Sequence, residues 1–280
     1  MPRKRVTQIF PWLLPLRIKQ RLFCFYIAMR LDGNRYAATK SETLLPYRLF
    51  ETSCPLYNRE TGFDMMYQEN KVFNLKLAAA TLNRLVIRPH ETFSFWKLVR
   101  YADRDTPYKD GLTVIDGKLT TAPGGGMCQM SNLLFWMFLH TPLTVVERHG
   151  HAVKDFPEPP SDAPMGVDAT VSEGWLDLKV RNETKASFQI GIAFDEEHII
   201  GCLLTDRDTG QFYEVVNGKP VYFRKDNKVF EEVDVNQKTI SRATGTCVSE
   251  KLLYRNKCEI GYPLPNETEI TNEMESAEKG

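Results

Sequence analysis

The feature that most constrains the fold is a run of three glycines, 124–126, followed at once by Met127 and Cys128. Glycine takes positive φ without steric cost, so the run predicts a tight turn. The apolar residues after it recur at three- and four-residue steps and stop before Pro142. This spacing predicts a buried helix over residues 128–139. The sequence therefore places Cys128 at the start of a helix.

A cysteine at a helix start lies in an electropositive place, because free backbone N–H groups and the helix dipole favour negative charge there. We expect the Cys128 thiol to be partly ionised, and the thiolate is the nucleophilic form of cysteine. Backbone N–H groups near Gly125 and Gly126 can stabilise an oxyanion, and Gln129 can add a side-chain donor. The alternative is a buried, unreactive cysteine.

Two histidines follow in the segment Glu147–His151. We expect a strand over residues 143–153, on which Glu147, His149 and His151 share one face. A histidine near the thiol can act as general base and then as general acid. His151 is the candidate base, with an ordinary strand histidine as the alternative. His149 is interpreted as structural or substrate-facing.

Asp168 lies on the next expected strand, 167–172, where its carboxylate can orient a histidine. Alternatively, it caps the turn after Gly166. Papain-like and transglutaminase-like enzymes have the same chain order: a cysteine on a helix, a histidine on a strand and an aspartate on the next strand. The similarity is an analogy of layout. Arg148 is a candidate substrate binder, since its guanidinium fork matches a carboxylate.

A zinc site is a third alternative for the same residues. One thiolate, two imidazoles and a carboxylate form a chemically suitable ligand set for zinc, here from Cys128, His149, His151 and Asp168. In the favoured interpretation the site holds no metal and needs no cofactor.

The composition excludes some classes of protein. The 280 residues contain 36 Lys and Arg against 36 Asp and Glu, and this balance argues against nucleic acid as a partner. The six cysteines are scattered, without a CxxC pair. They predict neither a disulfide-built scaffold nor a paired-cysteine zinc site.

The N-terminal segment is basic and apolar but matches no targeting signal. Its apolar stretch over 9–16 is short and contains two prolines, and Arg17 follows where a cleavage site would be needed. The next apolar run, 22–29, is shorter than the roughly 20 residues that span a membrane. We therefore expect a cytoplasmic protein. A peripheral membrane contact through this segment is an alternative to an amphipathic helix packed on the domain.

The fold class follows from the order of the patterns. A helical pattern covers 70–88, and a polar turn at Asp116-Gly117 predicts a hairpin over 112–119. Prolines mark 156–165 as a loop. Strand patterns follow at 167–172, 175–180, 187–194 and 199–205, and Asn217-Gly218 predicts a hairpin between 212–216 and 221–223. Helices followed by strands predict an α+β fold, with the cysteine-bearing helix on a mainly antiparallel sheet and a β-rich C-terminal third.

Several motifs, taken in order, resemble the VanW family. They are Phe93-Ser-Phe95, Asp110-Gly111, Gly124–Ser131, Glu147–His151, Gly166–Thr170 and Asp177–Asn182. The resemblance covers residues 70–205 and suggests four parts. They are a helical or irregular extension over 1–69, the VanW domain over 70–205, a β-rich extension over 206–264 and a disordered acidic tail over 265–280.

The resemblance implies an accessory role in glycopeptide (vancomycin) resistance, exerted on cell-wall peptidoglycan or its precursors. Some proteins with this domain are described as cysteine L,D-transpeptidases that cross-link peptidoglycan stem peptides. That chemistry would make Cys128 the nucleophile and His151 the base, oriented by Asp168. The substrate site would then be lined by Gly125, Gly126, Gln129, Ser131, Arg148 and His149. The alternative is a non-catalytic protein that binds a cell-wall precursor or a resistance partner.

Overall fold

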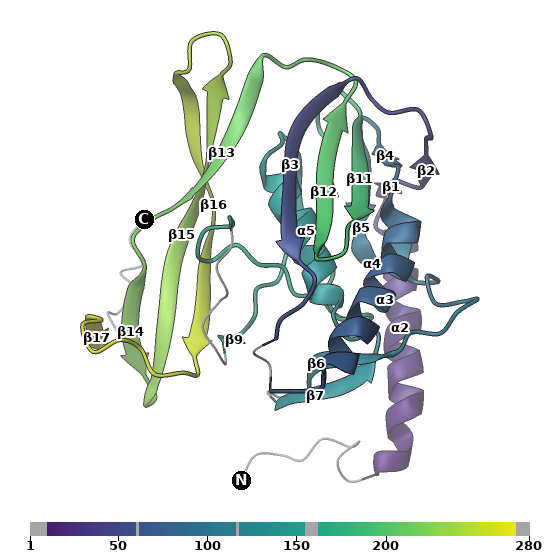
Figure 1. Cartoon of the computed structure of the whole chain (residues 1–280), viewed down its shortest axis with the longest axis vertical. Coiled ribbons are helices and arrows are strands. Elements are labelled where there is room, and N and C mark those ends of the chain that lie inside the picture. The colour runs from purple at the N-terminus through teal and green to yellow at the C-terminus, as the bar shows by residue number, and fades with distance from the viewer. Residues whose placement is uncertain (1–9, 60–61, 116–117, 155–161, 273–280) are drawn as a thin grey trace.

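The computed structural model describes residues 10–59, 62–115, 118–154 and 162–272. Over these ranges the fold is α+β, as predicted, with helices in the N-terminal half and strands in the C-terminal third. Figure 1 shows the helices gathered on one side and a long-stranded C-terminal sheet on the other. No helix in the described ranges is long and apolar enough to cross a membrane.

The central sheet has five strands in the order β2-β4-β11-β12-β3. Their bounds are Thr39–Lys40, Leu85–Ile87, Phe188–Phe194, His198–Thr205 and Tyr47–Pro55. Its pairs are antiparallel. The strands predicted at 187–194 and 199–205 are confirmed as β11 and β12.

Four α-helices occur in the described chain: α2 (Leu14–Leu31, after the short 3-10 helix η1, Pro11–Leu13), α3 (Met65–Leu82), α4 (Phe95–Val99) and α5 (Met127–Leu139). The predicted cysteine-bearing helix is confirmed as α5, and most of its side chains are buried. It lies close over β12 because Gly201 has no side chain. A Cβ there would come within 2.4 Å of Met137.

A second sheet has the order β1-β5-β10-β8, with bounds Arg35–Tyr36, Glu91–Ser94, Lys179–Arg181 and Thr144–Glu147. Beside it, the buried carboxylate of Asp177 accepts hydrogen bonds from Ser94 Oγ at 2.6 Å and from the Trp96 amide at 3.1 Å. Burial raises the pKa of Asp177 to about 6. A separate hairpin pairs β6 (Asp110–Ile115) with β7 (Lys118–Pro123), around the turn that was predicted at 116–117 and lies outside the described residues.

The C-terminal sheet has the order β17-β14-β15-β16-β9, with β13 also paired to β15. The bounds are Ile270–Asn272, Val221–Lys225, Lys228–Ser241, Cys247–Ile260, Val153–Lys154 and, for β13, Gln211–Asn217. This sheet is joined to the end of α5 through Gln237, whose side-chain amide donates to the carbonyls of Leu139 (2.6 Å) and Thr141 (3.0 Å).

The strand predicted over 143–153 is shorter in the structure. It stops at Glu147 as β8, and 148–152 are irregular before β9. The strands predicted at 167–172 and 175–180 are also wrong, apart from one bridge and the start of β10. Backbone amides there bond to other partners. The Ala169 amide donates to the Asn132 side chain and that of Thr170 to the His149 carbonyl, both at 2.7 Å.

The hairpin predicted at Asn217-Gly218 does not form, because β13 and β14 both pair with β15 rather than with each other. The helix predicted to residue 88 ends at Leu82, since Arg84 takes a φ of 68° and the chain then enters β4. Ile270–Asn272 form β17, parallel to β14, within the tail predicted to be disordered. Most of the loop predicted at 156–165 lies outside the described residues.

The glycine turn makes a stability prediction. A Cβ on Gly125 would lie 2.2 Å from the Gly111 carbonyl, whereas one on Gly218 would meet nothing nearer than 3.6 Å. We expect Gly125→Ala to lower the free energy of unfolding by about 1–3 kcal/mol, the usual cost of overpacking. Urea unfolding measures it, with Gly218→Ala as the matched control. Equal stabilities of the two variants would contradict the close approach.

Candidate active site

The turn before α5 is fixed by contacts that only glycines allow. Gly126 is the N-cap of α5 with a φ of 99°. Gly125 touches the backbone of Gly111, and its carbonyl accepts from the side chain of Asn74 at 3.1 Å. The same Asn74 amide holds the Lys109 backbone through bonds of 2.9 Å in both directions. The start of α5 is therefore rigidly positioned.

The first turn of α5 leaves backbone donors free. In the described part of the chain, the amides of Met127 and Cys128 have no hydrogen-bond acceptor, which is normal for the start of a helix. These two N–H groups are the candidate oxyanion donors beside the thiol.

Cys128 is half-buried and its sulfur faces the segment after Asp168. The Sγ atom lies 3.4 Å from Thr170 Oγ1 and 4.0 Å from the Val171 carbonyl oxygen. Burial by itself raises the pKa of the thiol, but hydrogen bonds to His151 and Thr170 outweigh it, and the pKa of Cys128 is lowered overall. Hydrogen bonds from neighbouring residues therefore stabilise the thiolate.

His151 links the thiol to a buried carboxylate. Its Nδ1 lies 2.7 Å from Asp168 Oδ2, and its backbone amide donates to the same oxygen at 2.7 Å. With Nδ1 engaged by Asp168, Nε2 is the ring nitrogen that serves Cys128. The hydrogen bonds to Asp168 and then to Cys128 raise the pKa of His151 to about 10. These contacts favour the thiolate at Cys128 and the imidazolium at His151.

Arg148 holds the other oxygen of Asp168. Its Nη2 bonds to Asp168 Oδ1, and its Nε donates to the Asp168 carbonyl at 2.6 Å. The guanidinium also lies 4.4 Å from the ring centroid of Tyr254. Burial alone would raise the pKa of Asp168. The hydrogen bond to His151 and the charge of Arg148 outweigh burial, so the pKa of Asp168 is lowered overall. The fork predicted to bind a substrate carboxylate is therefore occupied by an internal one.

The structure places the remaining predicted residues around this centre with other partners. His149 Nε2 lies 3.1 Å from Glu147 Oε1. Ser131 is fully buried and donates to the Ala169 carbonyl at 2.5 Å. Gln129 donates its side-chain amide to the Pro55 carbonyl at 2.7 Å. Their contacts tie α5 to its neighbours, and their predicted role toward a substrate stays a prediction.

The zinc alternative has little geometric support. Among the described residues, no group of three or more His, Cys, Asp or Glu side chains could hold a metal ion. His149 is turned toward Glu147, and both carboxylate oxygens of Asp168 are engaged by Arg148 and His151.

Two residues near the start of α5 were not predicted as functional from the sequence. Thr170 supplies the hydroxyl next to the sulfur. Lys71 covers Gly126, where a Cβ would lie 2.2 Å from its Cγ, and burial lowers the pKa of Lys71 to about 8. Both lie within segments that resemble the family, but nothing local to either segment indicates contact with the helix start.

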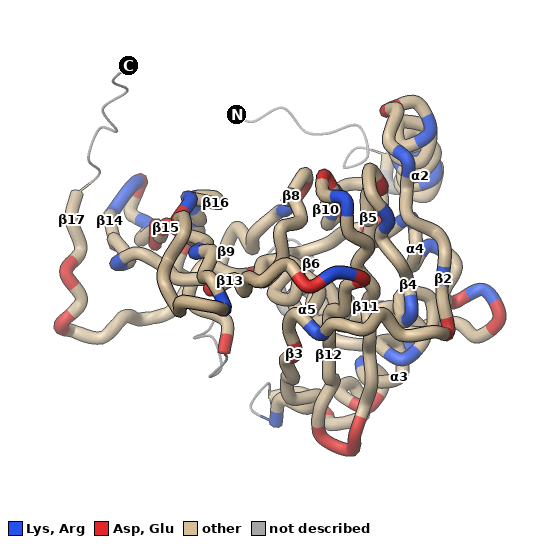
Figure 2. The backbone as a smooth tube through the Cα atoms, turned by 90° about the horizontal axis from the view of Figure 1, so that it is seen from above, with Lys and Arg blue, Asp and Glu red and all other residues tan. Residues whose placement is uncertain are grey.

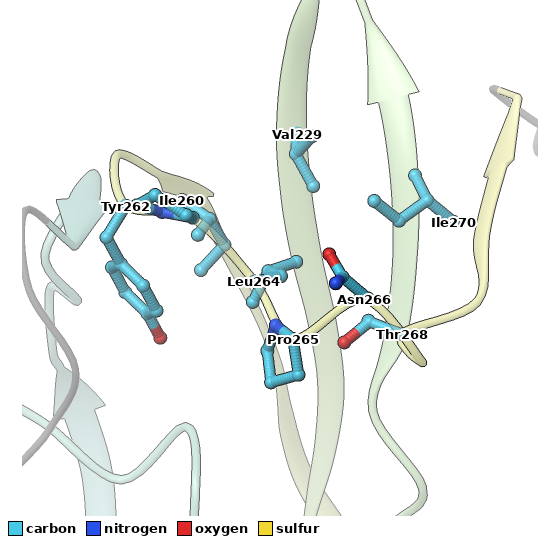
Figure 3. A pocket seen from close by; sticks show the side chains of 9 residues that line it. Val229, Ile260, Tyr262, Leu264, Pro265, Asn266, Thr268 and Ile270 are labelled. Carbon is cyan, nitrogen blue, oxygen red and sulfur yellow. The ribbon is translucent and has the colours of Figure 1, made fainter.

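The pocket shown in Figure 3 lies away from the thiol. Its volume is about 340 Å³, and its lining, which includes Val229, Tyr262 and Ile270, comes from the C-terminal sheet and the segment after β16. None of the candidate site residues lines it. The geometry at Cys128, rather than this hollow, marks the candidate active site.

Comparison with known proteins agrees with the resemblance. The family model described as "VanW like protein" matches residues 70–204. The "Vancomycin B-type resistance protein VanW" of Enterococcus faecalis (strain ATCC 700802 / V583) is 60% identical over 270 residues, which cover 96% of this chain and 98% of that protein.

A second relative matches only in part. The "Uncharacterized protein YoaR" of Bacillus subtilis (strain 168) is 34% identical over 115 residues, which are 41% of this chain and 36% of that protein. No solved structure matches the chain.

The hydrogen bonds to Cys128 make a testable prediction about its ionisation. Alkylation with iodoacetamide, followed by mass spectrometry across a pH series, should give Cys128 a midpoint below the usual cysteine pKa of about 8.5. His151→Ala should move the Cys128 midpoint upward, because burial raises the pKa of the thiol and the variant lacks the histidine that lowers it. The midpoint is the readout, since half-burial slows access of the reagent.

The exposed Cys24 and Cys247 serve as internal controls, because their labelling shows that the reagent is active in every sample. An unchanged Cys128 midpoint in His151→Ala would show that the histidine does not stabilise the thiolate.

Proposed function

The chain belongs to the VanW family, and from this premise we propose that it acts in glycopeptide resistance as a cysteine acyltransferase of the L,D-transpeptidase type. The proposed substrate is the stem peptide of peptidoglycan or of its precursors. The relative that matches nearly the whole chain carries vancomycin resistance in its name.

One observation carries the chemical part of the proposal: His151, whose ring is held by Asp168, lowers the pKa of the Cys128 thiol. The lowered pKa of the thiol favours the thiolate, and the raised pKa of the imidazole favours the imidazolium. These are the charge states that a nucleophile and its proton donor need. The 2.7 Å contact between His151 Nδ1 and Asp168 fixes the ring orientation. These are the roles of a nucleophile, a general base and an orienting carboxylate.

The first half-reaction forms a thioester. The Cys128 thiolate attacks a backbone carbonyl carbon of the donor stem peptide, and the negative charge moves to the carbonyl oxygen. The free amides of Met127 and Cys128 supply hydrogen bonds to that oxygen. The C–N bond then breaks, and His151 gives its proton to the departing amine.

The second half-reaction transfers the acyl group. An amine of the acceptor peptide attacks the thioester carbon, and its proton passes to the neutral His151. The C–S bond breaks and Cys128 leaves as the thiolate, which restores the starting charges. Asp168 stays ionised throughout, because its pKa is lowered by His151 and Arg148.

Incubation with purified muropeptides, followed by mass spectrometry, tests this function. Wild type should form cross-linked dimers, and Cys128→Ala should form none. His151→Ala should slow the reaction by about 10²–10⁴-fold, the usual contribution of a general acid–base group. Cys247→Ala, which alters an exposed cysteine on β16, is the matched control and should keep full activity.

Full cross-linking by Cys128→Ala would contradict the acyl-transfer chemistry. If wild type forms no product but binds muropeptides as tightly as Cys128→Ala and His151→Ala do, the protein is instead a non-catalytic binding protein for the precursor.

The charges at the site also set a pH dependence. The thiolate is lost as pH falls through the lowered pKa of Cys128, and the imidazolium is lost as pH rises through about 10. We expect the rate of thioester formation to be bell-shaped in pH, with its alkaline limb near that value. A single acid limb without an alkaline one would contradict His151 as the proton donor.

A further inference from the structure

The N-terminal half of α2 extends beyond the body of the protein and exposes large apolar side chains. In Figure 1 this purple helix reaches past the other elements at its lower end. Only Tyr26 and Met29 of the helix are buried. Just before and along the helix, Trp12 is 74% exposed, Phe23 66% and Leu16 65%. Apolar exposure gathered on one element marks an interaction surface.

These apolar side chains form a stripe with cations on both sides. Successive residues of an α-helix are rotated by about 100°, so residues at steps of four and seven share a face. The stripe consists of Leu16, Phe23, the half-buried Ile27 and Leu31, with the polar Gln20 between Leu16 and Phe23. The flanking cations are Lys19 and Arg30 on one side and Arg17 and Arg21 on the other. The helix contains no Asp or Glu, and Figure 2 shows its basic residues in blue.

A groove continues this surface between α2 and α4. Its volume is about 390 Å³, and Phe23 and Arg30 line it opposite Lys97 and Arg100. The Arg100 guanidinium lies 3.6 Å from the ring centroid of Tyr26, which holds it in place.

None of the flanking cations of α2, and neither Lys97 nor Arg100, has an ion-pair partner among the described residues. Two nearby acids are hydrogen-bonded to tyrosines and form no ion pair with these cations. Glu173 accepts from the Tyr26 hydroxyl and Asp32 from the Tyr36 hydroxyl, each at 2.6 Å. The surface therefore combines exposed apolar groups with unpaired positive charge.

This combination favours one occupant over the other candidates. A second copy of the chain would bring two sets of unpaired cations together, and like charges repel. An anionic phospholipid surface complements both properties, since its phosphates meet the cations and its acyl boundary accepts the apolar stripe. The absence of acidic residues from α2 fits the same partner.

We propose that α2 lies in the plane of an anionic phospholipid bilayer, with its apolar stripe at the boundary of the headgroups and the acyl chains. Trp12 sits at the headgroup level, where indole rings gather. The groove between α2 and α4 holds the phosphate of one lipid headgroup through Arg30, Lys97 and Arg100. This inference rests on α2 and α4 and does not depend on the chemistry at Cys128.

Co-sedimentation of the full-length protein with vesicles tests the inference. The protein should pellet with phosphatidylcholine vesicles that contain phosphatidylglycerol and stay in solution with phosphatidylcholine alone. Leu16→Glu/Phe23→Glu should abolish pelleting. Arg17→Gln should weaken partitioning about fivefold at low salt, which corresponds to about 1 kcal/mol per cation near an anionic surface.

The matched control is Val248→Glu/Leu252→Glu on β16, where the original side chains are 58% and 55% exposed. It should pellet like wild type, and thermal unfolding checks that both double variants are folded. Equal pelleting with and without phosphatidylglycerol, or equal pelleting of the two double variants, would overturn the inference. A third outcome would also overturn it: wild type does not bind vesicles but is a dimer in sedimentation velocity, and Leu16→Glu/Phe23→Glu dissociates that dimer.

Discussion

The carboxylate of Asp168 receives hydrogen bonds from two sides, and the candidate site is arranged around them. One oxygen bonds to Arg148, and the other accepts from the amide and the ring of His151. Asp168 is only 8% exposed, so its charge has little solvent to stabilise it and depends on these partners. Removing Arg148 would leave the charge on His151 alone. The position and charge of the imidazole beside Cys128 follow from this one carboxylate.

The second requirement is the close approach of backbones at the start of α5. Gly125 and Gly111 touch where any Cβ would overlap, and Gly126 leaves space that Lys71 covers. This packing aims the first amides of α5 and the Cys128 thiol toward the segment that carries Thr170. Cys128 comes from α5, whereas His151, Asp168 and Thr170 come from irregular chain between β8 and β10. α5 itself lies close over β12, where Gly201 leaves room for Met137. The glycines therefore determine where the helix start and its thiol lie relative to the charged residues.

Local patterns predicted much of this arrangement, and tertiary contacts decided the rest. The glycine run and the apolar spacing after it predicted α5, and the order of elements pointed to the cysteine, histidine and aspartate that the structure brings together. The strand expected at His151 was wrong, because the His151 amide bonds to the Asp168 side chain and the His149 carbonyl accepts from the Thr170 amide. The Asn217-Gly218 hairpin failed because β15 is long enough to pair with both flanking strands. The contact of Lys71 with Gly126 joins residues far apart in sequence, which no local pattern encodes.

The central claim is that His151 is an imidazolium held between Asp168 and the Cys128 thiolate. The most direct test is an NMR titration of the ring carbon–hydrogen signals in protein with labelled histidine, with His151 assigned from His151→Gln. The account predicts that His151 titrates near the raised pKa of about 10, and that Cys128→Ala lowers this value while Asp168→Asn lowers it further. A His151 pKa near the ordinary value of about 6.5, unchanged in both variants, would contradict the account.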